Sequence, residues 1–235
     1  MTRAVVLRDL MANGTGFGPE RLRATAVELD LPLADVLVVA GQPVPAELLP
    51  PERDPEILRA FTYRVTYCDH RQLAVLEEFV RSLAAESPAA GVARDAAPGP
   101  DRFADIFNGL LRNRGLGRRE LPFAGLSMST IVGLQRGRWH NLKQLAAMAG
   151  PLGWQLADLA VLAGEPDPAD NGRFLLCHHY GRVYLAAVPL TSDQLVQALL
   201  EADRLSGRVD HGAWQPVVTT RVDCPDEAGA VPGSG

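Results

Sequence analysis

The sequence predicts a mainly α protein, and three observations point to this fold class. Apolar residues recur at helical spacing in five short segments between residues 102 and 168. Part of that pattern is repeated near the N-terminus. Residues rich in β-formers flank Gly181 and are followed by a further amphipathic helix. We therefore expect a five-helix domain with a truncated N-terminal copy and a C-terminal β-hairpin plus helix.

Composition divides the chain into five parts. Residues 1–85 are predicted to form an N-terminal helical region that carries the degenerate half-repeat. Residues 86–101 are small and rich in Pro and Gly, without apolar periodicity, which is typical of a linker. Residues 102–168 are expected to form the five-helix domain, and 169–221 the hairpin and its helix. The Pro- and Gly-rich residues 222–235 predict a flexible tail.

Two helices are expected in the N-terminal region, at 55–66 and 71–85. The apolar stripe of the second comprises Leu73, Leu76, Phe79, Val80 and Leu83. A helix of this kind must bury its apolar face against another element. The stripe from Leu73 to Leu83 is therefore a candidate dimer surface, together with the predicted C-terminal helix.

The first two helices of the five-helix block differ in strength of signal. The first carries one apolar stripe, made of Phe103, Ile106, Phe107, Leu110 and Leu111. Gly115 and Gly117 are predicted to end it. A short second helix is expected from about Arg118 to Ala124, closed by Gly125.

The other three helices have polar caps or terminal glycines. Ser127 is predicted to cap the third helix, which ends at Gly137. Asn141 is predicted to cap the fourth helix, and the fifth extends from Leu156 to Ala163, before Gly164. The inward-facing residues of these helices are expected to be Ile131, Leu134, Leu142, Leu145, Ala149, Leu156, Leu159 and Leu162.

The internal repeat has an offset of 123 residues. Residues 33–46 match 156–169, and the pattern of Leu22, Ala26 and Leu29 recurs upstream of the second copy. Too few residues precede Leu22 for three full helices, and 14–19 is rich in Gly. We therefore expect the N-terminal copy to contain only the fourth and fifth helices of the block.

The C-terminal part is predicted to start with a β-hairpin. Residues 173–177 and 182–186 are rich in β-formers and flank Gly181. Thr191 or Ser192 is then expected to cap a helix. Its apolar side would comprise Leu195, Leu199 and Leu200.

The block from Gly125 to Arg138 resembles the core of the Xre family of transcriptional regulators, also called the lambda-repressor-like or Cro-like helix-turn-helix family. The residues that fit its pattern are Ser127, Ile131, Leu134, Gln135 and Gly137. Residues 142–145 and 154–158 are similar to the family's fourth and fifth helices. The resemblance extends over about 60 residues, and it implies a lambda-repressor-like five-helix fold whose third helix enters the DNA major groove.

The resemblance implies a DNA-binding site made of two groups of residues. The positions that contact bases correspond to Met128, Ser129 and Gly133, with Thr130 beside them. The positions that contact phosphates correspond to Arg118, Arg119, Arg136, Arg138, His140, Asn141 and Lys143. The sequence departs from the family at Pro122, which falls inside the expected second helix, and that helix is also short.

Charge is distributed unevenly along the chain. Residues 1–100 carry 10 basic and 14 acidic side chains, residues 101–150 carry 8 and 3, and residues 151–235 carry 5 and 11. A local basic window inside an acidic protein favours phosphate binding. Together with this charge, the resemblance to the Xre family implies double-stranded DNA as the partner and a homodimer on half-sites about one DNA turn apart.

An alternative is a protein-interaction scaffold that retains the helix-turn-helix fold without reading DNA sequence. Met128 and Gly133 offer no bidentate hydrogen bonds to base edges. The shortened N-terminal copy and the acidic flanks also favour this alternative, whose ligand would be a partner protein.

No catalytic or metal-binding constellation is found in the sequence. Cys177, His178 and His179 lack a second group of ligands at suitable spacing, so no metal is expected. The Gly-rich residues 14–18 lack the strand and the Lys-Ser/Thr ending of a phosphate-binding loop. We expect neither a cofactor nor an enzyme. A weaker third hypothesis is a ligand pocket in the hairpin, lined by His178, Tyr180 and Tyr184.

The sequence predicts a cytoplasmic protein. It has no apolar run long enough to cross a bilayer and no signal-peptide core at its start. Its cysteines are odd in number and widely spaced, which favours a reducing compartment. Lys143 is the only lysine, and this arginine bias indicates a GC-rich genome. We therefore expect a regulator of the actinobacterial type.

Overall fold

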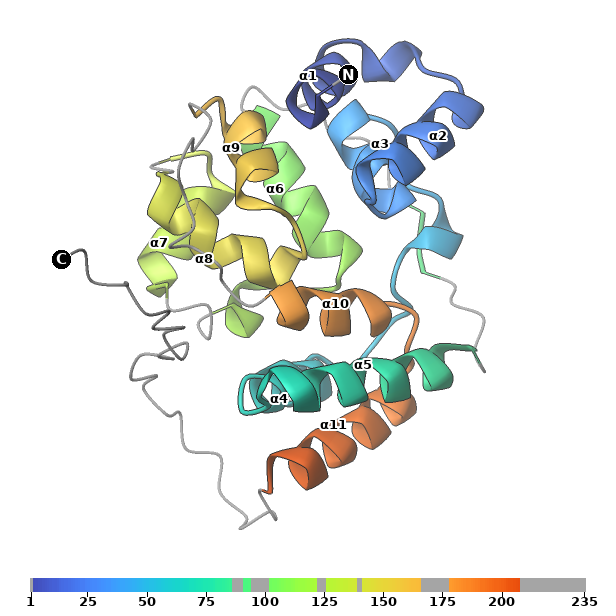
Figure 1. Cartoon of the computed structure of the whole chain (residues 1–235), viewed down its shortest axis with the longest axis vertical. Helices are drawn as coiled ribbons and strands as arrows, with labels where there is room; N and C mark the ends of the chain where they lie inside the picture. The colour runs from blue at the N-terminus through green and yellow to red at the C-terminus, as the bar shows by residue number, and fades with distance from the viewer. Residues whose placement is uncertain are drawn as a thin grey trace, which may run out of the picture.

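The computed structural model describes residues 2–85, 91–93, 102–121, 126–138, 141–165 and 178–207. Helices make up most of these ranges, which confirms a mainly α fold, and the helices predicted at 55–66 and 71–85 are present (Figure 1). The α-helices are α1 (Arg3–Asn13), α2 (Pro19–Leu29), α3 (Leu33–Ala40), α4 (Pro55–Val65), α5 (His70–Ala85), α6 (Arg102–Asn113), α7 (Met128–Gln135), α8 (Leu142–Leu152), α9 (Leu156–Ala163), α10 (His178–Ala186) and α11 (Ser192–Ser206). Short 3₁₀ helices are η1 (Gly14–Gly16), η2 (Ala46–Leu48) and η3 (Arg118–Glu120).

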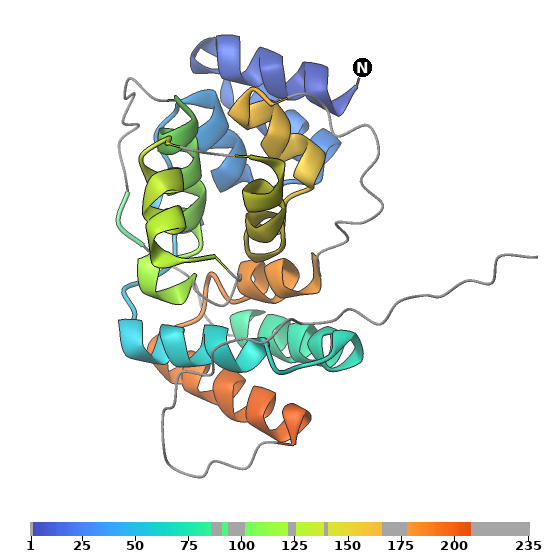
Figure 2. The ribbon, with the colours of Figure 1, turned by 90° about the vertical axis from the view of Figure 1, so that its left-hand side faces the viewer.

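The helices are arranged in two layers, each with its own apolar core (Figures 1 and 2). The upper core combines side chains from α1–α3 with side chains from α6–α9. The lower core combines α4, α5, α10 and α11. Each core therefore draws on segments from both sides of residues 86–101, and the two halves of the chain are packed together in both layers.

The internal repeat includes whole helices. α2 and α8 have the same length and lie 123 residues apart, and so do α3 and α9. Gly41 and Gly164 end α3 and α9 with φ values of 70° and 71°, a left-handed conformation that glycine adopts without strain. The fourth and fifth helices of the block, and their N-terminal copies, are therefore formed as predicted.

The repeat continues into the lower layer, where the sequence pattern did not reveal it. Asp69 accepts hydrogen bonds from the backbone N–H groups of Gln72 (2.9 Å) and Arg71 (2.8 Å) at the start of α5. These bonds hold the pKa of the Asp69 carboxyl below its ordinary value. The Gln72 side chain accepts in return from the Asp69 backbone N–H. Thr191 and Gln194 form the same reciprocal cap on α11, 122 residues later.

We therefore divide the described chain into a first unit, α1–α5, and a second unit, α6–α11. Their contacts are reciprocal, because α4 packs on α11 while α10 packs on α5. In the upper layer, α1 packs on α9 while α6 packs on α3. Reciprocal pairing of this kind is the signature of a two-fold interface between identical subunits. Here both subunit equivalents belong to one chain.

The two-fold relation holds at the level of single residues between α5 and α11. The Gln72 amide donates to the backbone carbonyl of Leu205 at 2.6 Å. The Gln194 amide donates to the backbone carbonyl of Leu83 at 2.8 Å. The donors, Gln72 and Gln194, lie 122 residues apart, and so do the acceptors, Leu83 and Leu205, so each bond joins a residue of one unit to the other unit in the exchanged order. A shared local fold alone would not produce this symmetry, which comes from the packing of one unit on the other.

Two ion pairs link the units in the upper layer. Asp35 of the first unit pairs with Arg114 of the second at 2.7 Å, and both side chains are buried. Asp158, the repeat equivalent of Asp35, pairs with Arg3 of the first unit at 2.7 Å. Asp35 also accepts a hydrogen bond from the Trp154 indole N–H at 2.8 Å. Trp154 is thus a core residue that also binds across the interface.

The predicted β-hairpin is wrong for residues 178–186, which form α10; residues 173–177 lie outside the described ranges. α10 packs on both α5 and α8, and its buried face includes Val183 and Tyr184. At Gly181, a Cβ atom would lie only 2.2 Å from the Gly150 carbonyl oxygen and 2.4 Å from the Gly153 backbone. Gly181 is therefore a site of close helix crossing rather than a turn, and tertiary packing overrides the β propensity of this segment.

Two other expectations are corrected. In place of a helix from Arg118 to Ala124, η3 covers only Arg118–Glu120, and Leu121 is not helical. Leu121 keeps backbone angles in the α region (φ −99°, ψ −15°), but Pro122 follows and has no N–H to donate to a helical hydrogen bond; residues 122–125 lie outside the described ranges. On α11, Leu195 is buried but Leu200 is 60% exposed, so the two do not share the buried face.

The candidate dimer surfaces are buried within the chain. Leu73, Leu76, Val80 and Leu83 of α5, and Leu195 of α11, belong to the lower core. The apolar stripes that suggested a second copy therefore pack against the other half of the same molecule.

Candidate nucleic-acid interface

The N-terminal end of α7 is held by the cap that the sequence predicts. The Ser127 hydroxyl accepts a hydrogen bond from the Thr130 backbone N–H at 3.2 Å. Ile131 and Leu134 are fully buried and attach the helix to the upper core, where α7 contacts α6 and η3. The opposite side of α7 is left toward solvent at its N-terminal end, at the edge of the upper layer (Figure 1).

The C-terminal end of α7 is fixed by hydrogen bonds to its backbone carbonyls. The Asn108 side-chain amide of α6 donates to the Gln135 carbonyl at 2.7 Å, a contact that the sequence did not indicate. Gly137 ends the helix with a φ of 67°, as predicted. The Arg138 backbone N–H donates to the Gly133 carbonyl at 2.8 Å, and a Cβ on Gly133 would lie 3.2 Å from the Arg138 carbonyl oxygen. Gly133 therefore permits this tight turn.

The four expected base-contacting residues have different environments. Met128 is 45% exposed and Ser129 is exposed, both in the first turn of α7. Thr130 and Gly133 are half-buried. The hydroxyls of Ser129 and Thr130 lie 2.8 and 2.9 Å from the Ser127 hydroxyl, so all three form one polar cluster. The exposed first turn thus offers one thioether and hydroxyls that already have one hydrogen-bond partner.

Most of the expected phosphate-contacting residues are exposed around α7. Arg118 and Arg119 lie on η3, Arg136 and Arg138 lie in the turn after α7, and Lys143 is in the first turn of α8. We call these five cations the basic rim. Among the residues that the structure describes, no member of the basic rim forms an ion pair.

The basic rim differs in this respect from several arginines elsewhere in the structure. Arg21, Arg23, Arg59 and Arg204 are each paired with a carboxylate on a nearby helix turn or neighbouring helix. Between residues 118 and 143 the only acidic residue is Glu120. It is buried, and its carboxylate accepts a hydrogen bond from the Gly117 backbone N–H at 2.7 Å. Within the described residues, the positive charge of the rim is therefore not neutralised by a paired carboxylate.

Two further predicted phosphate contacts are less informative. Asn141 is exposed, and its side-chain oxygen caps α8 by accepting from the Gln144 backbone N–H at 3.0 Å. Its amide nitrogen is the part that an external group would meet. His140 lies outside the described residues.

The hypothesis of a ligand pocket at His178, Tyr180 and Tyr184 does not match the packing of Tyr184. Its ring is buried in the lower core and its hydroxyl donates to the Thr62 carbonyl at 3.1 Å. Burial raises the pKa of this hydroxyl well above its ordinary value. The side chains of His178 and His179, and all of Cys177, lie outside the described part.

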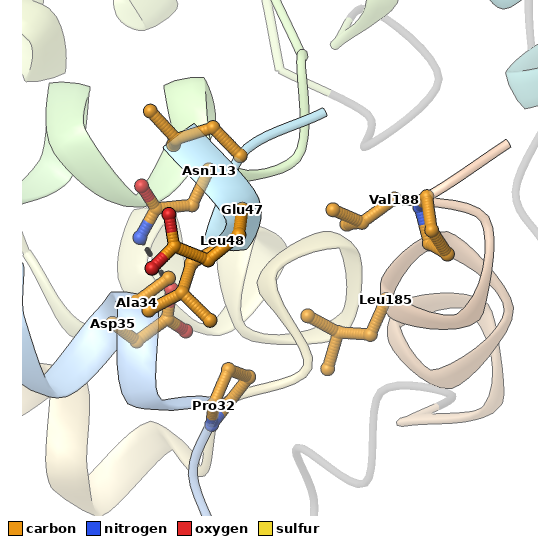
Figure 3. Close-up of a pocket in the computed structure, with 10 residues that line it drawn as sticks. Pro32, Ala34, Asp35, Glu47, Leu48, Asn113, Leu185 and Val188 are labelled. Carbon is orange, nitrogen blue, oxygen red and sulfur yellow. Dashed lines mark hydrogen bonds between the residues drawn. The ribbon is translucent and has the colours of Figure 1, made fainter. Parts of the chain in front are cut away.

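A pocket of about 240 Å³ lies elsewhere, between the two layers (Figure 3). Leu185 and Val188 face Asp35 and Glu47 across it, and most of its other walls are apolar. The Asp35 carboxylate is already engaged by Arg114 and by the Asn113 amide, at 2.7 and 2.9 Å. Its role is therefore to join the units. Within the described ranges, no cluster of three or more His, Cys, Asp or Glu side chains is placed to hold a metal ion.

Comparison of the chain with family models, with curated proteins and with solved structures finds no match. In the part of the chain that the structure covers, no helix is both long enough and apolar enough to span a bilayer.

Proposed function

We propose that this chain is a DNA-binding transcriptional regulator that contacts double-stranded DNA through α7 and the basic rim. The sequence resemblance to the Xre family supports the proposal, and so does the exposure of Met128 and Ser129 at the start of a helix whose other face is buried. In helix-turn-helix proteins, the N-terminal residues of the second helix contact base edges while neighbouring segments grip phosphates.

The observation that carries the proposal is the unpaired charge of the basic rim. Five cations surround α7, and the one carboxylate in the same stretch is buried and engaged by backbone. A solvated charged surface usually mixes both signs, whereas a phosphate-binding surface concentrates one sign. The surrounding chain is acidic, so the rim is the part of the described surface best suited to a polyanion.

The test compares two double variants by gel shift on the DNA upstream of the protein's own gene, at low salt. Arg136→Ala/Arg138→Ala removes two rim cations. Arg23→Ala/Arg204→Ala is the matched control, because it removes two exposed arginines on α2 and α11 that are paired with nearby glutamates. Exposed pairs contribute at most about 1 kcal/mol, so both variants should fold. We expect the first to lose most DNA binding and the control to bind like wild type.

Two outcomes would overturn the proposal. One is the absence of any complex between wild type and DNA at about 50 mM salt or below, where phosphate contacts contribute more than at higher salt. The other is equal binding by the two double variants, since a surface that uses the rim must distinguish them. Circular dichroism of each variant establishes that the helices are retained.

A second candidate function is a protein-interaction scaffold. The polar cluster of Ser127, Ser129 and Thr130 favours it, because hydroxyls already bonded to one another are poorer readers of base edges. The exposed Met128 is suited to an apolar contact. A stable partner that co-purifies with wild type and is lost with Met128→Glu, in a protein indifferent to DNA, would favour this function over the first.

A further inference from the structure

We propose that one chain, as a monomer, binds a single DNA half-site that has no two-fold symmetry. This inference rests on the proposed function, and it specifies the kind of DNA and the stoichiometry. It departs from the expectation of a homodimer on paired half-sites. Four features of the structure carry it: the two-fold relation inside the chain, the loss of the usual pairing faces, the missing second reading helix, and the charge around the place where that helix is missing.

Helix-turn-helix proteins usually bind palindromic DNA because a second, symmetry-related subunit presents a second reading helix about one turn away. In this chain the symmetry-related subunit is already present. The bonds from Gln72 to Leu205 and from Gln194 to Leu83 are related by exchanging equivalent residues, 122 positions apart, between the two units. The chain therefore contains within itself the kind of interface that two separate subunits would form.

The apolar faces that could bind a second copy of the chain are buried in this internal interface. The apolar residues of α5 and α11 that fill the lower core are Leu73, Leu76, Val80, Leu83, Leu195, Ala198 and Ala202. To pair with a second chain, these faces would first have to leave the internal interface, so no additional apolar area would be buried. What remains apolar on the outside of α11 is small, namely Val196 and Leu200.

The first unit has no counterpart of α7. Residues 14–18 connect α1 directly to α2, whereas residues 114–141 connect α6 to α8 and carry η3 and α7. The short connection is held in place by Gln42, whose amide donates to the carbonyls of Gly14 and Phe17 at 2.6 and 2.9 Å. The two units form a pseudo-dimer, and this pseudo-dimer therefore has one helix placed to contact bases, α7, where a symmetric dimer has two.

The surface at this short connection is also unsuited to phosphate. Arg21 lies over the Phe17 ring, 3.5 Å from its centre, and its guanidinium pairs with Asp9 at 2.9 Å. The nearby Arg23 pairs with Glu20. These cations are neutralised by carboxylates of the same unit, in contrast to the basic rim of the second unit. DNA contacts are therefore expected on one side of the pseudo-dimer only.

The experiment has three parts. Light scattering measures the mass of the free protein, in vitro selection from random duplex DNA gives the preferred sequence, and light scattering of the complex gives its stoichiometry. We expect the mass of one chain, 25.3 kDa, a selected sequence without two-fold symmetry, and one chain per duplex. A Val196→Glu/Leu200→Glu variant tests the remaining apolar patch of α11, and we expect its mass and DNA affinity to equal those of wild type.

The outcomes separate this inference from the function on which it rests. A palindromic selected sequence bound by two chains would overturn the inference and leave the proposed function intact. A free dimer that the Val196→Glu/Leu200→Glu variant converts to a monomer with weakened DNA binding would also overturn it. Absence of any DNA complex at low salt would overturn the proposed function, and this inference with it.

Discussion

The buried carboxylate of Asp35 offers the sharpest test of how the two units are held together. Its oxygens accept hydrogen bonds from Arg114 at 2.7 and 3.1 Å, from Asn113 at 2.9 Å and from Trp154 at 2.8 Å. Asp35→Ala removes the carboxylate and leaves an arginine whose side chain has no exposed surface. Breaking a buried pair in this way costs about 3–5 kcal/mol, because the remaining charge is neither paired nor hydrated.

The repeat supplies a matched control, Asp158→Ala. Asp35 and Asp158 occupy the same position of the first turn in α3 and α9, so both changes remove the same favourable interaction with the helix N-terminus. The difference lies in the partner, because the Arg3 side chain is 33% exposed and the Arg114 side chain is 0% exposed. Arg3 can turn to water when its partner is removed. We therefore expect Asp158→Ala to cost about 1–2 kcal/mol, less than the loss at Asp35.

Urea denaturation followed by circular dichroism and by tryptophan fluorescence measures both free energies of unfolding. Asp35→Asn, which keeps the shape and one oxygen, is expected to fall between wild type and Asp35→Ala. The argument is refuted if Asp35→Ala and Asp158→Ala lose the same stability within about 0.5 kcal/mol, the usual range for surface substitutions. It is also refuted if Asp158→Ala loses more, since burial of the partner would then not decide the cost.

Three further predictions concern DNA binding, packing and pH. With five phosphate contacts, the logarithm of the DNA affinity should fall with the logarithm of salt with a slope of about −4.5, and Arg136→Ala/Arg138→Ala should reduce it to about −2.7; equal slopes in fluorescence anisotropy titrations would contradict this. Gly181→Ala should lower the free energy of unfolding, measured by thermal denaturation, by about 1–3 kcal/mol or more, because its Cβ would meet the backbone of α8. Gly16→Ala is the control and should cost little, because a Cβ there would have no neighbouring atom within 4 Å. A larger loss for Gly16→Ala would contradict the close crossing. The pKa of Asp69 is lowered in the folded state, so its carboxylate stabilises the fold above its ordinary pKa of 3.8, and this stabilisation is lost as the pH falls through the pKa of the folded state. Asp69→Asn should therefore flatten the acid side of the profile of unfolding free energy against pH. An unchanged profile would show that the cap does not titrate.

The candidate site shows how far local signals reach. Ser127, Asn141 and Gly137 were predicted as helix boundaries, and each has that role in the structure. The basic residues around α7 were also visible in the sequence. The sequence did not show that the nearby carboxylate leaves them unpaired, because this depends on Glu120 being buried and bound to the Gly117 N–H. The support that Asn108 gives to the end of α7 was equally invisible, since it joins residues 27 positions apart.

The sequence by itself determined the helices of the repeat, their caps and their buried faces, because these depend on interactions within one or two helical turns. Only the tertiary structure decided that residues 178–186 are a helix. Gly181 lacks a side chain where the backbone of α8 passes close to it, and α8 lies about 30 residues away along the chain. It also decided that the stripes of α5 and α11 pair within one chain. An apolar stripe specifies that a partner is needed but not which one, and that choice depends on complementary surfaces more than one hundred residues apart.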